Sequence, residues 1–115
     1  MEEKGNIRIF TTPILDNIKI LEYMGPVIVR NVRAMSIVHD WMTRVRDVVG
    51  GRSGSYQDLM KKMEEEVMEE IKEKTRKMGA NAVIDFKLDY DSIDGLLMAS
   101  VQGTAVVLDG WAAEE

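Results

Sequence analysis

The carboxyl-terminal half of the chain carries the pattern that most restricts its fold. The run "AVIDFKLDYD" alternates apolar and charged residues, as a half-buried strand does. "DSIDG" then supplies turn residues, and "LLMASVQGTAVVL" follows as a second long strand. We therefore predict an antiparallel hairpin that needs a second layer over its apolar face. The positions expected to share that face on the first strand are Ile84, Phe86, Leu88 and Tyr90.

Two extended segments precede this hairpin. Residues 7–12, "IRIFTT", predict a short strand that Pro13 closes. Residues 18–32 also read as extended, but Gly25 and Pro26 interrupt them, so we expect two strands or one bent edge strand. The apolar residues of this second segment fall on both parities, which is typical of a sheet covered on both faces.

Two helices are expected between these segments and the hairpin. Ser36 is a candidate N-cap for a helix running to about Val49. A second helix should begin near Tyr56, with Ser55 as its N-cap, and end before a left-handed Gly79. Both carry apolar residues at spacings of three and four, so each has a face to bury.

These elements predict an α+β domain. The expected architecture is a two-layer α/β sandwich, with a mostly antiparallel sheet, two helices on one face and the order β-β-β-α-α-β-β. At 115 residues the chain fits one domain, residues 1–115, with residues 1–6 and 109–115 as loose tails.

Composition excludes several classes of function. The chain has no cysteine, which rules out thiolate catalysis and disulfides, and His39 is its one histidine. A net charge of −5 disfavours nucleic acid and anionic membrane as partners. No apolar run approaches the ~20 residues of a membrane-spanning helix. We therefore expect a cytoplasmic protein with no nucleic-acid or membrane partner.

The one candidate binding loop is the stretch "GGRSGSY". Its backbone N–H groups, the Arg52 guanidinium and the start of the second helix could hold a phosphate or carboxylate. The alternative is a helix–helix corner, in which the glycines make the turn and Arg52 pairs with Asp47 or a neighbouring chain. The residues of the candidate anion site are Gly51, Arg52, Ser53, Gly54 and Ser55.

Other polar residues give weaker signals, and we predict no catalytic residue, no cofactor and no metal site within one chain. His39 and Asp40 are adjacent on a helix and point about 100° apart, so they cannot form an oriented dyad. Soft heavy metals prefer thiolates, which the chain lacks. Carboxylates near one another are more simply solvated than metal-bound. They are Glu64 to Glu66, Asp85, Asp89, Asp91 and Asp94.

The apolar surface exceeds what one two-layer domain can bury. Strands with apolar residues on both sides, a broad apolar arc on the first helix and Trp111 in the tail all need a cover. Small residues at Ala99, Gly103 and Ala105 leave room for a helix or a neighbouring chain. An identical copy is the economical third layer, so we expect a homo-oligomer.

Several stretches resemble the YbjQ-like family of small bacterial and archaeal proteins. They are "TTPILDNIKILEYMG", "RDVVGGRSGSY", "MGANAVI", "LDYD" and "LMASVQGTAV", in this order, and they cover roughly residues 11–108. The resemblance implies a two-layer α/β fold assembled into a homopentameric ring. Members are largely uncharacterised and are often described as heavy-metal-binding.

Overall fold

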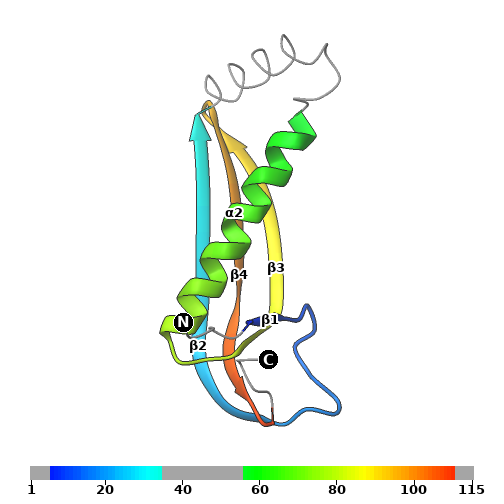
Figure 1. The fold of residues 1–115 in the computed structure, drawn as a ribbon. Coiled ribbons are helices and arrows are strands. Elements are labelled where there is room, and N and C mark those ends of the chain that lie inside the picture. The colour runs from blue at the N-terminus through cyan, green and yellow to red at the C-terminus, as the bar shows by residue number, and fades with distance from the viewer. Residues whose placement is uncertain (1–5, 35–55, 111–115) are drawn as a thin grey trace.

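The computed structural model describes residues 6–34 and 56–110 (Figure 1). The predicted helix over residues 36–49 and the Ser55 cap lie outside these residues. The described elements make an α+β fold with four strands and one helix: β1 (Arg8–Ile9), β2 (Ile20–Ala34), α2 (Tyr56–Lys77), β3 (Ala82–Ile93) and β4 (Leu96–Leu108).

The four strands form one mixed sheet in the order β1-β3-β4-β2. β4 pairs antiparallel with both β3 and β2, whereas β1 pairs parallel with β3. The expectation of a mostly antiparallel sheet is therefore corrected: the amino-terminal strand runs beside β3 in the same direction. The described order, β-β-α-β-β, also does not reproduce the expected β-β-β-α-α-β-β.

Residues 20–34 form one continuous strand. The backbone absorbs the Gly25–Pro26 interruption through register shifts between Ile20 and Glu22 and between Tyr23 and Gly25. Gly25 has a φ of +121°, a value that favours glycine. No other strand of the described residues pairs with the far side of β2, so Pro26 lies on an edge strand, where its missing N–H is tolerated. Of the two alternatives, the bent edge strand is the one observed.

The hairpin of β3 and β4 is confirmed. Asp94 and Gly95 form its two-residue turn, with φ values of +45° and +78°. Two successive positive φ angles are the signature of a type I′ turn, which matches the twist of the flanking strands.

The end of α2 also follows the prediction. Gly79 has a φ of +85°, and its N–H donates to the Arg76 carbonyl at 3.0 Å. The Ala80 N–H donates to the Thr75 carbonyl at 3.2 Å, which completes a Schellman motif. This cap turns the chain directly from α2 into β3.

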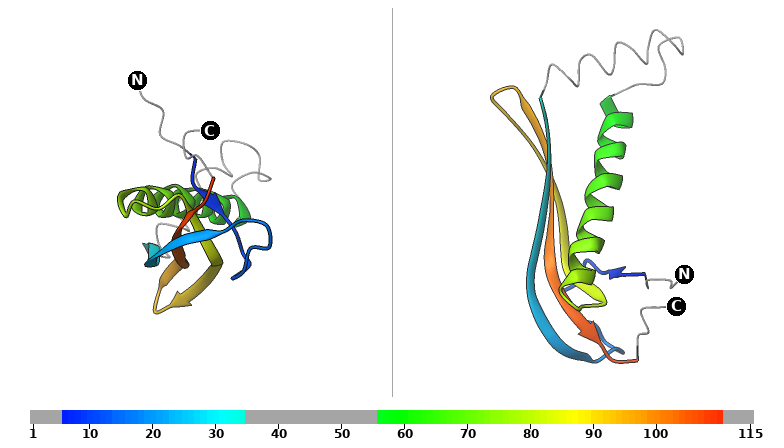
Figure 2. Two further views of the ribbon diagram at one scale, coloured as in Figure 1. Left: turned by 90° about the horizontal axis from the view of Figure 1, so that it is seen from below. Right: turned by 60° about the vertical axis from the view of Figure 1, so that its left-hand side comes forward.

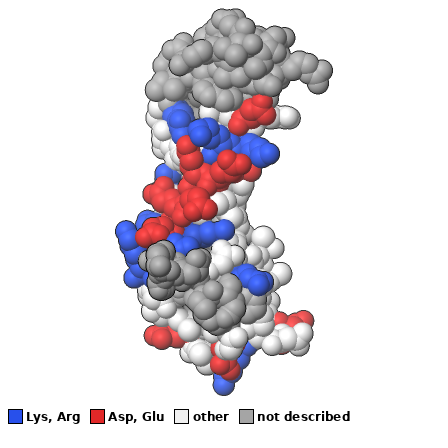
Figure 3. All heavy atoms as spheres, in the orientation of Figure 1, with Lys and Arg blue, Asp and Glu red and all other residues white. Residues whose placement is uncertain are grey.

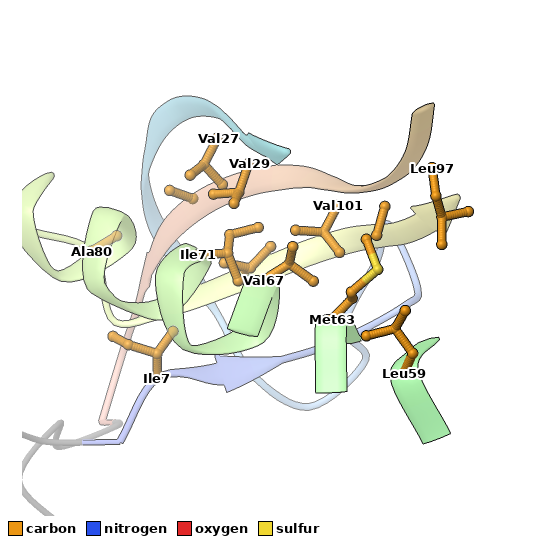
Figure 4. Packing of buried hydrophobic residues seen from close by; sticks show 13 residues of the cluster. Ile7, Val27, Val29, Leu59, Met63, Val67, Ile71, Ala80, Leu97 and Val101 are labelled. Atoms are coloured by element: carbon orange, nitrogen blue, oxygen red, sulfur yellow. The ribbon is translucent and has the colours of Figure 1, made fainter. Parts of the chain in front are cut away.

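The main core lies between α2 and one face of the sheet, which we call the inner face (Figures 2 and 4). Met63, Val67 and Ile71 of α2 have no exposed surface and pack on Val29 and Val101. Ala99 and Ala105 are fully buried in the same cluster. Of the two occupants expected for these small residues, α2 is the one that approaches them.

A second, smaller cluster covers one end of the opposite face, the outer face. Ala82, Ile84, Val106 and Leu108 are buried there. The segment between β1 and β2 packs over them through Phe10, Leu15 and Ile18, and the first residue of β2, Ile20, joins it. The end of the sheet near the Asp94–Gly95 turn has no such cover among the described residues.

A bulge in β3 changes which side chains share a face. The register shifts between Ile84 and Lys87, and Asp85 has a φ of +55°. Ile84 therefore joins the outer-face cluster, whereas Phe86 and Tyr90 pack against the inner one. The prediction that all four apolar residues of this strand share a face is wrong at Ile84, because the extra residue reverses the alternation there.

Candidate functional site

The loop predicted to hold an anion, from Gly51 to Ser55, lies outside the described residues, and so does His39. Of the described surface, the outer face near the β3–β4 turn is the part that carries exposed apolar side chains in neighbouring strands. Exposed fractions there are 48% for Val32, 51% for Ile93 and 43% for Leu96. Large apolar side chains gathered on a sheet face commonly mark an interaction surface. This region is the candidate functional site.

Strand alternation builds this surface. Val27 and Val29 point into the inner core with 3% exposure each, so Ile28, Arg30 and Val32 point to the outer face. On β4 the alternation is the same: Leu97 is 2% exposed, and its neighbour Leu96 is on the outer side. The apolar outer residues are thus a direct result of strands with apolar residues at both parities.

One charged row crosses the outer face. Arg30 and Asp89 both pair with Ser100, from its two sides. They stand two strand spacings apart, roughly 10 Å, which is beyond the reach of an ion pair within one chain. The margin of the sheet at β2 therefore presents a cation, and the margin at β3 presents an anion at the same level.

The β3 bulge opens a hollow of about 190 Å³ on the outer face. Gly103 stands opposite the bulge, and a Cβ there would overlap Val83 Cγ1 and lie 3.0 Å from the Ile84 carbonyl oxygen. The Asp85 carboxylate accepts a hydrogen bond from Lys87 Nζ at 3.1 Å. The lining residues are Pro26, Ile28, Asp85, Gln102, Gly103 and Thr104.

On the inner side, a polar cluster ties β2 to α2. Asn31 Nδ2 donates to Glu66 Oε1 at 2.7 Å, and Arg33 forms an ion pair with the same oxygen. Arg33 Nε also donates to Asn31 Oδ1 at 3.2 Å. Partial burial raises the pKa of Glu66, but the hydrogen bonds from Arg33 and Asn31 outweigh it and hold the pKa below its ordinary value. Glu66 is therefore ionised and structural.

A second polar tie joins α2 to β3. The Tyr90 hydroxyl lies 2.5 Å from Glu64 Oε2 and 3.3 Å from the Met60 carbonyl oxygen. Burial, followed by the hydrogen bond to the Glu64 carboxylate, raises the pKa of Tyr90 well above its ordinary value. The hydroxyl thus stays protonated and acts as a donor.

The acidic residues singled out from the sequence do not converge on a metal site. Glu64 faces Tyr90 and Glu66 faces Arg33, while Asp85 pairs with Lys87. Within residues 6–34 and 56–110, no group of three or more histidine, cysteine, aspartate or glutamate side chains could hold a metal ion. In the same residues, α2 is too polar to cross a lipid bilayer.

Comparison with known proteins places this arrangement in a family. The sequence profile of the YbjQ-like family, described as "Putative heavy-metal-binding", matches residues 7–109. The chain belongs to the YbjQ-like family. A UPF0145 protein from Persephonella marina is 40% identical over 101 residues, which is 88% of this chain and 98% of that protein.

The fold is also found in a solved structure. A protein of unknown function of the DUF74 family from Pediococcus pentosaceus superposes with a TM-score of 0.52. It shares 14% identity and covers 90% of this chain and 98% of its own. At this identity the likeness concerns the fold alone. The family profile and the relative from Persephonella marina confirm the resemblance found in the sequence motifs at the level of the family.

Sequence reasoning missed the residues at the margins of the candidate surface. Arg30 was not singled out, because a lone arginine in an apolar strand carries no motif. Asp89 was noted only as one of several carboxylates. The pairing of both with Ser100 brings them to the same level. The register that the Asp94–Gly95 turn fixes for β3 and β4 could have placed Asp89 opposite Ser100, but the sequence holds no such signal for Arg30, whose level depends on the pairing of β2 with β4.

Proposed function

We propose that the chain forms a cytoplasmic homo-oligomeric ring, a pentamer, that acts as a structural or small-ligand-binding module without enzymatic activity. The observation that carries the proposal is the difference between the two faces of the sheet. α2 closes the inner face, while Ile28, Val32, Ile93 and Leu96 remain between 41% and 51% exposed on the outer side. Contact between copies would remove apolar surface of this kind from water.

The ring form and the number five have different support. Exposed apolar strands favour association of some kind, whereas the number five comes from the resemblance to the YbjQ-like family. The hollow at Gly103 supports the ligand-binding part, because Asp85, Gln102 and Thr104 place polar groups beside apolar Pro26 and Ile28. Any ligand would be held where subunits meet.

Native mass spectrometry of the full chain tests this proposal. We expect one dominant assembly of five chains before and after chelation. A copurified ligand would appear as added mass on the assembly that is lost on denaturation. A folded single chain at all concentrations would contradict the proposal.

The family description favours a second candidate, a metal-binding protein with sites at subunit interfaces. A ring axis could bring together copies of one carboxylate from several chains, which one chain cannot do. The outer-face carboxylates Asp89 and Asp91 are the described residues closest to this requirement. Assembly that strictly depends on added metal would favour this candidate over the first.

A further inference from the structure

β2 and β3, the two strands that flank β4, each have one occupied half and one half without a second strand partner among the described residues. On β2, Lys74 Nζ donates to the Ile28 carbonyl at 2.8 Å and so occupies the edge at this residue. On β3, the Phe86 N–H donates to the Phe10 carbonyl at 3.0 Å. Beyond these points, residues 29–34 of β2 and 88–93 of β3 pair only with β4.

These two unpaired stretches lie at the same level of the sheet. Val29 and Leu88 both pair with Val101, and both stretches run from there toward the hairpin end. β2 and β3 are each antiparallel to β4, so they run in the same direction. A rotation about an axis along the strands would therefore bring one stretch beside the other in parallel, without a shift in height.

The backbone groups on the two edges are complementary in this arrangement. The two-residue turn makes Ile93 and Leu96 a hydrogen-bonded pair, so every second residue of β3 before Ile93 also directs its N–H and C=O groups toward β4. Leu88 and Tyr90 lie between those residues and therefore direct their N–H and C=O groups to the outer edge of β3. The Ile28 carbonyl points to the edge of β2, so the backbone N–H and C=O groups of Arg30 and Val32 point to that edge as well. Arg30 would then stand opposite Asp89 of the next copy. The backbone N–H and C=O groups of Arg30 would bond to Leu88 and Tyr90, the residues on either side of Asp89, as a parallel ladder requires.

The charges on the outer face fit the same pairing. Arg30 is exposed at the β2 margin and Asp89 is exposed at the β3 margin, in one row with Ser100. Neither makes an ion pair with another described residue. Side chains opposite one another in a parallel ladder lie on the same face, so Arg30 of one copy would meet Asp89 of the next.

The charges on α2 are complementary in the opposite sense. Glu66 contacts β2 and marks the flank of the helix on that side, whereas Glu64 contacts Tyr90 and marks the flank toward β3. Figure 3 shows the acidic side chains of the first flank as a band across α2. Residues three or four positions from these two share their flanks. The β2 flank adds Glu69, Glu70 and Glu73 against Lys62 and Lys74, so it is net acidic. The β3 flank adds Lys61 and Lys72 to Glu64, so it is net basic.

We propose that copies of this chain join edge to edge, with residues 29–34 of β2 pairing in parallel with residues 88–93 of β3 in the next copy. The occupant of each edge is a second copy, and the Arg30–Asp89 row and the opposite flanks of α2 set its position. Because the two edges differ, the contact is head-to-tail, and it closes into the proposed ring when the rotation between neighbouring copies divides a full turn evenly. This inference rests on the proposed function, because it names the interface of that ring.

Disulfide trapping tests the pairing, since the chain has no cysteine of its own. In Arg30→Cys/Asp89→Cys, the Cα atoms of the two cysteines in one chain stand roughly 10 Å apart, too far for a disulfide, whereas those of adjacent copies would stand roughly 5 Å apart, within disulfide range. We expect oxidation to give a ladder of covalently linked chains up to the size of the ring. Val32→Cys/Asp91→Cys occupies another matched row, keeps Arg30 and Asp89 in place, and should give the same ladder.

Two control variants and the oligomeric state make the result specific. Arg30→Cys/Asp91→Cys is displaced by two residues, so its thiols would lie on residues roughly 8 Å apart and should link poorly. A linked dimer from Arg30→Cys alone would indicate a two-fold β2–β2 contact and overturn the proposal. An assembly seen by native mass spectrometry without a ladder from either matched pair would also overturn it, while leaving the proposed function standing. A single folded chain in that spectrum would instead remove the proposed function.

Discussion

The inner and outer faces of the sheet carry the same kinds of side chain in adjacent positions but have different surroundings. Leu97 is 2% exposed and Leu96 is 43% exposed, although they are neighbours in β4. The same holds in β2 for the neighbours Val29 at 3% and Ile28 at 41%. Apolar residues at both parities therefore indicate that a strand has two apolar faces, but the elements packed on each face decide which of them is closed. An apolar face left open in one chain is a feature that association can use.

The largest difference in stability should be the one between truncating Leu97 and truncating its neighbour Leu96. Leu97→Ala removes a buried side chain from the inner core and should lower the free energy of unfolding by about 2–5 kcal/mol. Leu96→Ala, on the outer face, should stay within about 0.5 kcal/mol. Urea denaturation of both variants at low protein concentration measures the difference. Equal losses would break the comparison, because they would mean that the folded chain buries both faces alike.

A smaller effect is expected where the two faces meet at the β3 bulge. Gly103→Ala would place a Cβ against Val83 and the Ile84 carbonyl, and overpacking of this kind costs about 1–3 kcal/mol. Ser100→Ala, on the outer face of the same strand, is the matched control and should change stability little. Thermal unfolding of the two variants gives the comparison. Wild-type stability for Gly103→Ala would show that the bulge can move away from β4.

Much of the fold was predictable from local signals. A turn within residues 91–95, the Gly79 cap and the apolar stripe of α2 each depend on residues close in sequence, and all three predictions are confirmed, with the turn narrowed to Asp94 and Gly95. The parallel pairing of β1 with β3 joins residues more than 70 positions apart, and no local pattern specifies it. The sequence does not predict the bulge at Asp85, because a positive φ is uncommon for aspartate and common for glycine.

Less of the candidate site could be predicted. A surplus of apolar strand residues was visible in the sequence, and Ile28 and Val32 are indeed exposed. The charged residues at the margins of the outer face could not be predicted from the sequence, since Arg30 and Asp89 reach the same level only through their shared partner Ser100. The predicted anion loop from Gly51 to Ser55 stays a prediction, because it lies outside the described residues.

The polar bonds at the margin of the inner face give a third way to sharpen the comparison. Tyr90→Phe removes the hydroxyl that bonds to Glu64 and Met60, and should cost about 1 kcal/mol. The folded pKa of Tyr90 is raised, so its contribution is fully present below pH 10.0, the ordinary value, and is lost as the pH rises through the folded pKa. Tyrosinate absorbance against pH should show one of the three tyrosines ionising late, and this late step should vanish in Tyr90→Phe. A late step that persists in the variant would assign it to another tyrosine.

The smallest effect should come from Glu66, the inner-face counterpart of the unpaired charges on the outer face. Its pKa is lowered in the folded chain, so its contribution is present above the ordinary value of 4.5 and is lost as the pH falls through the folded pKa. Because Glu66 and Arg33 are both partly exposed, Glu66→Gln should cost only about 0.5–1 kcal/mol at neutral pH. Urea denaturation between neutral pH and pH ~3 should show this difference from wild type shrinking as the pH falls. Glu65→Gln, one residue away and exposed, is the matched control and should change stability little at neutral pH. A difference for Glu66→Gln that is constant with pH would mean that packing around Asn31 and Arg33, rather than the charge, ties β2 to α2.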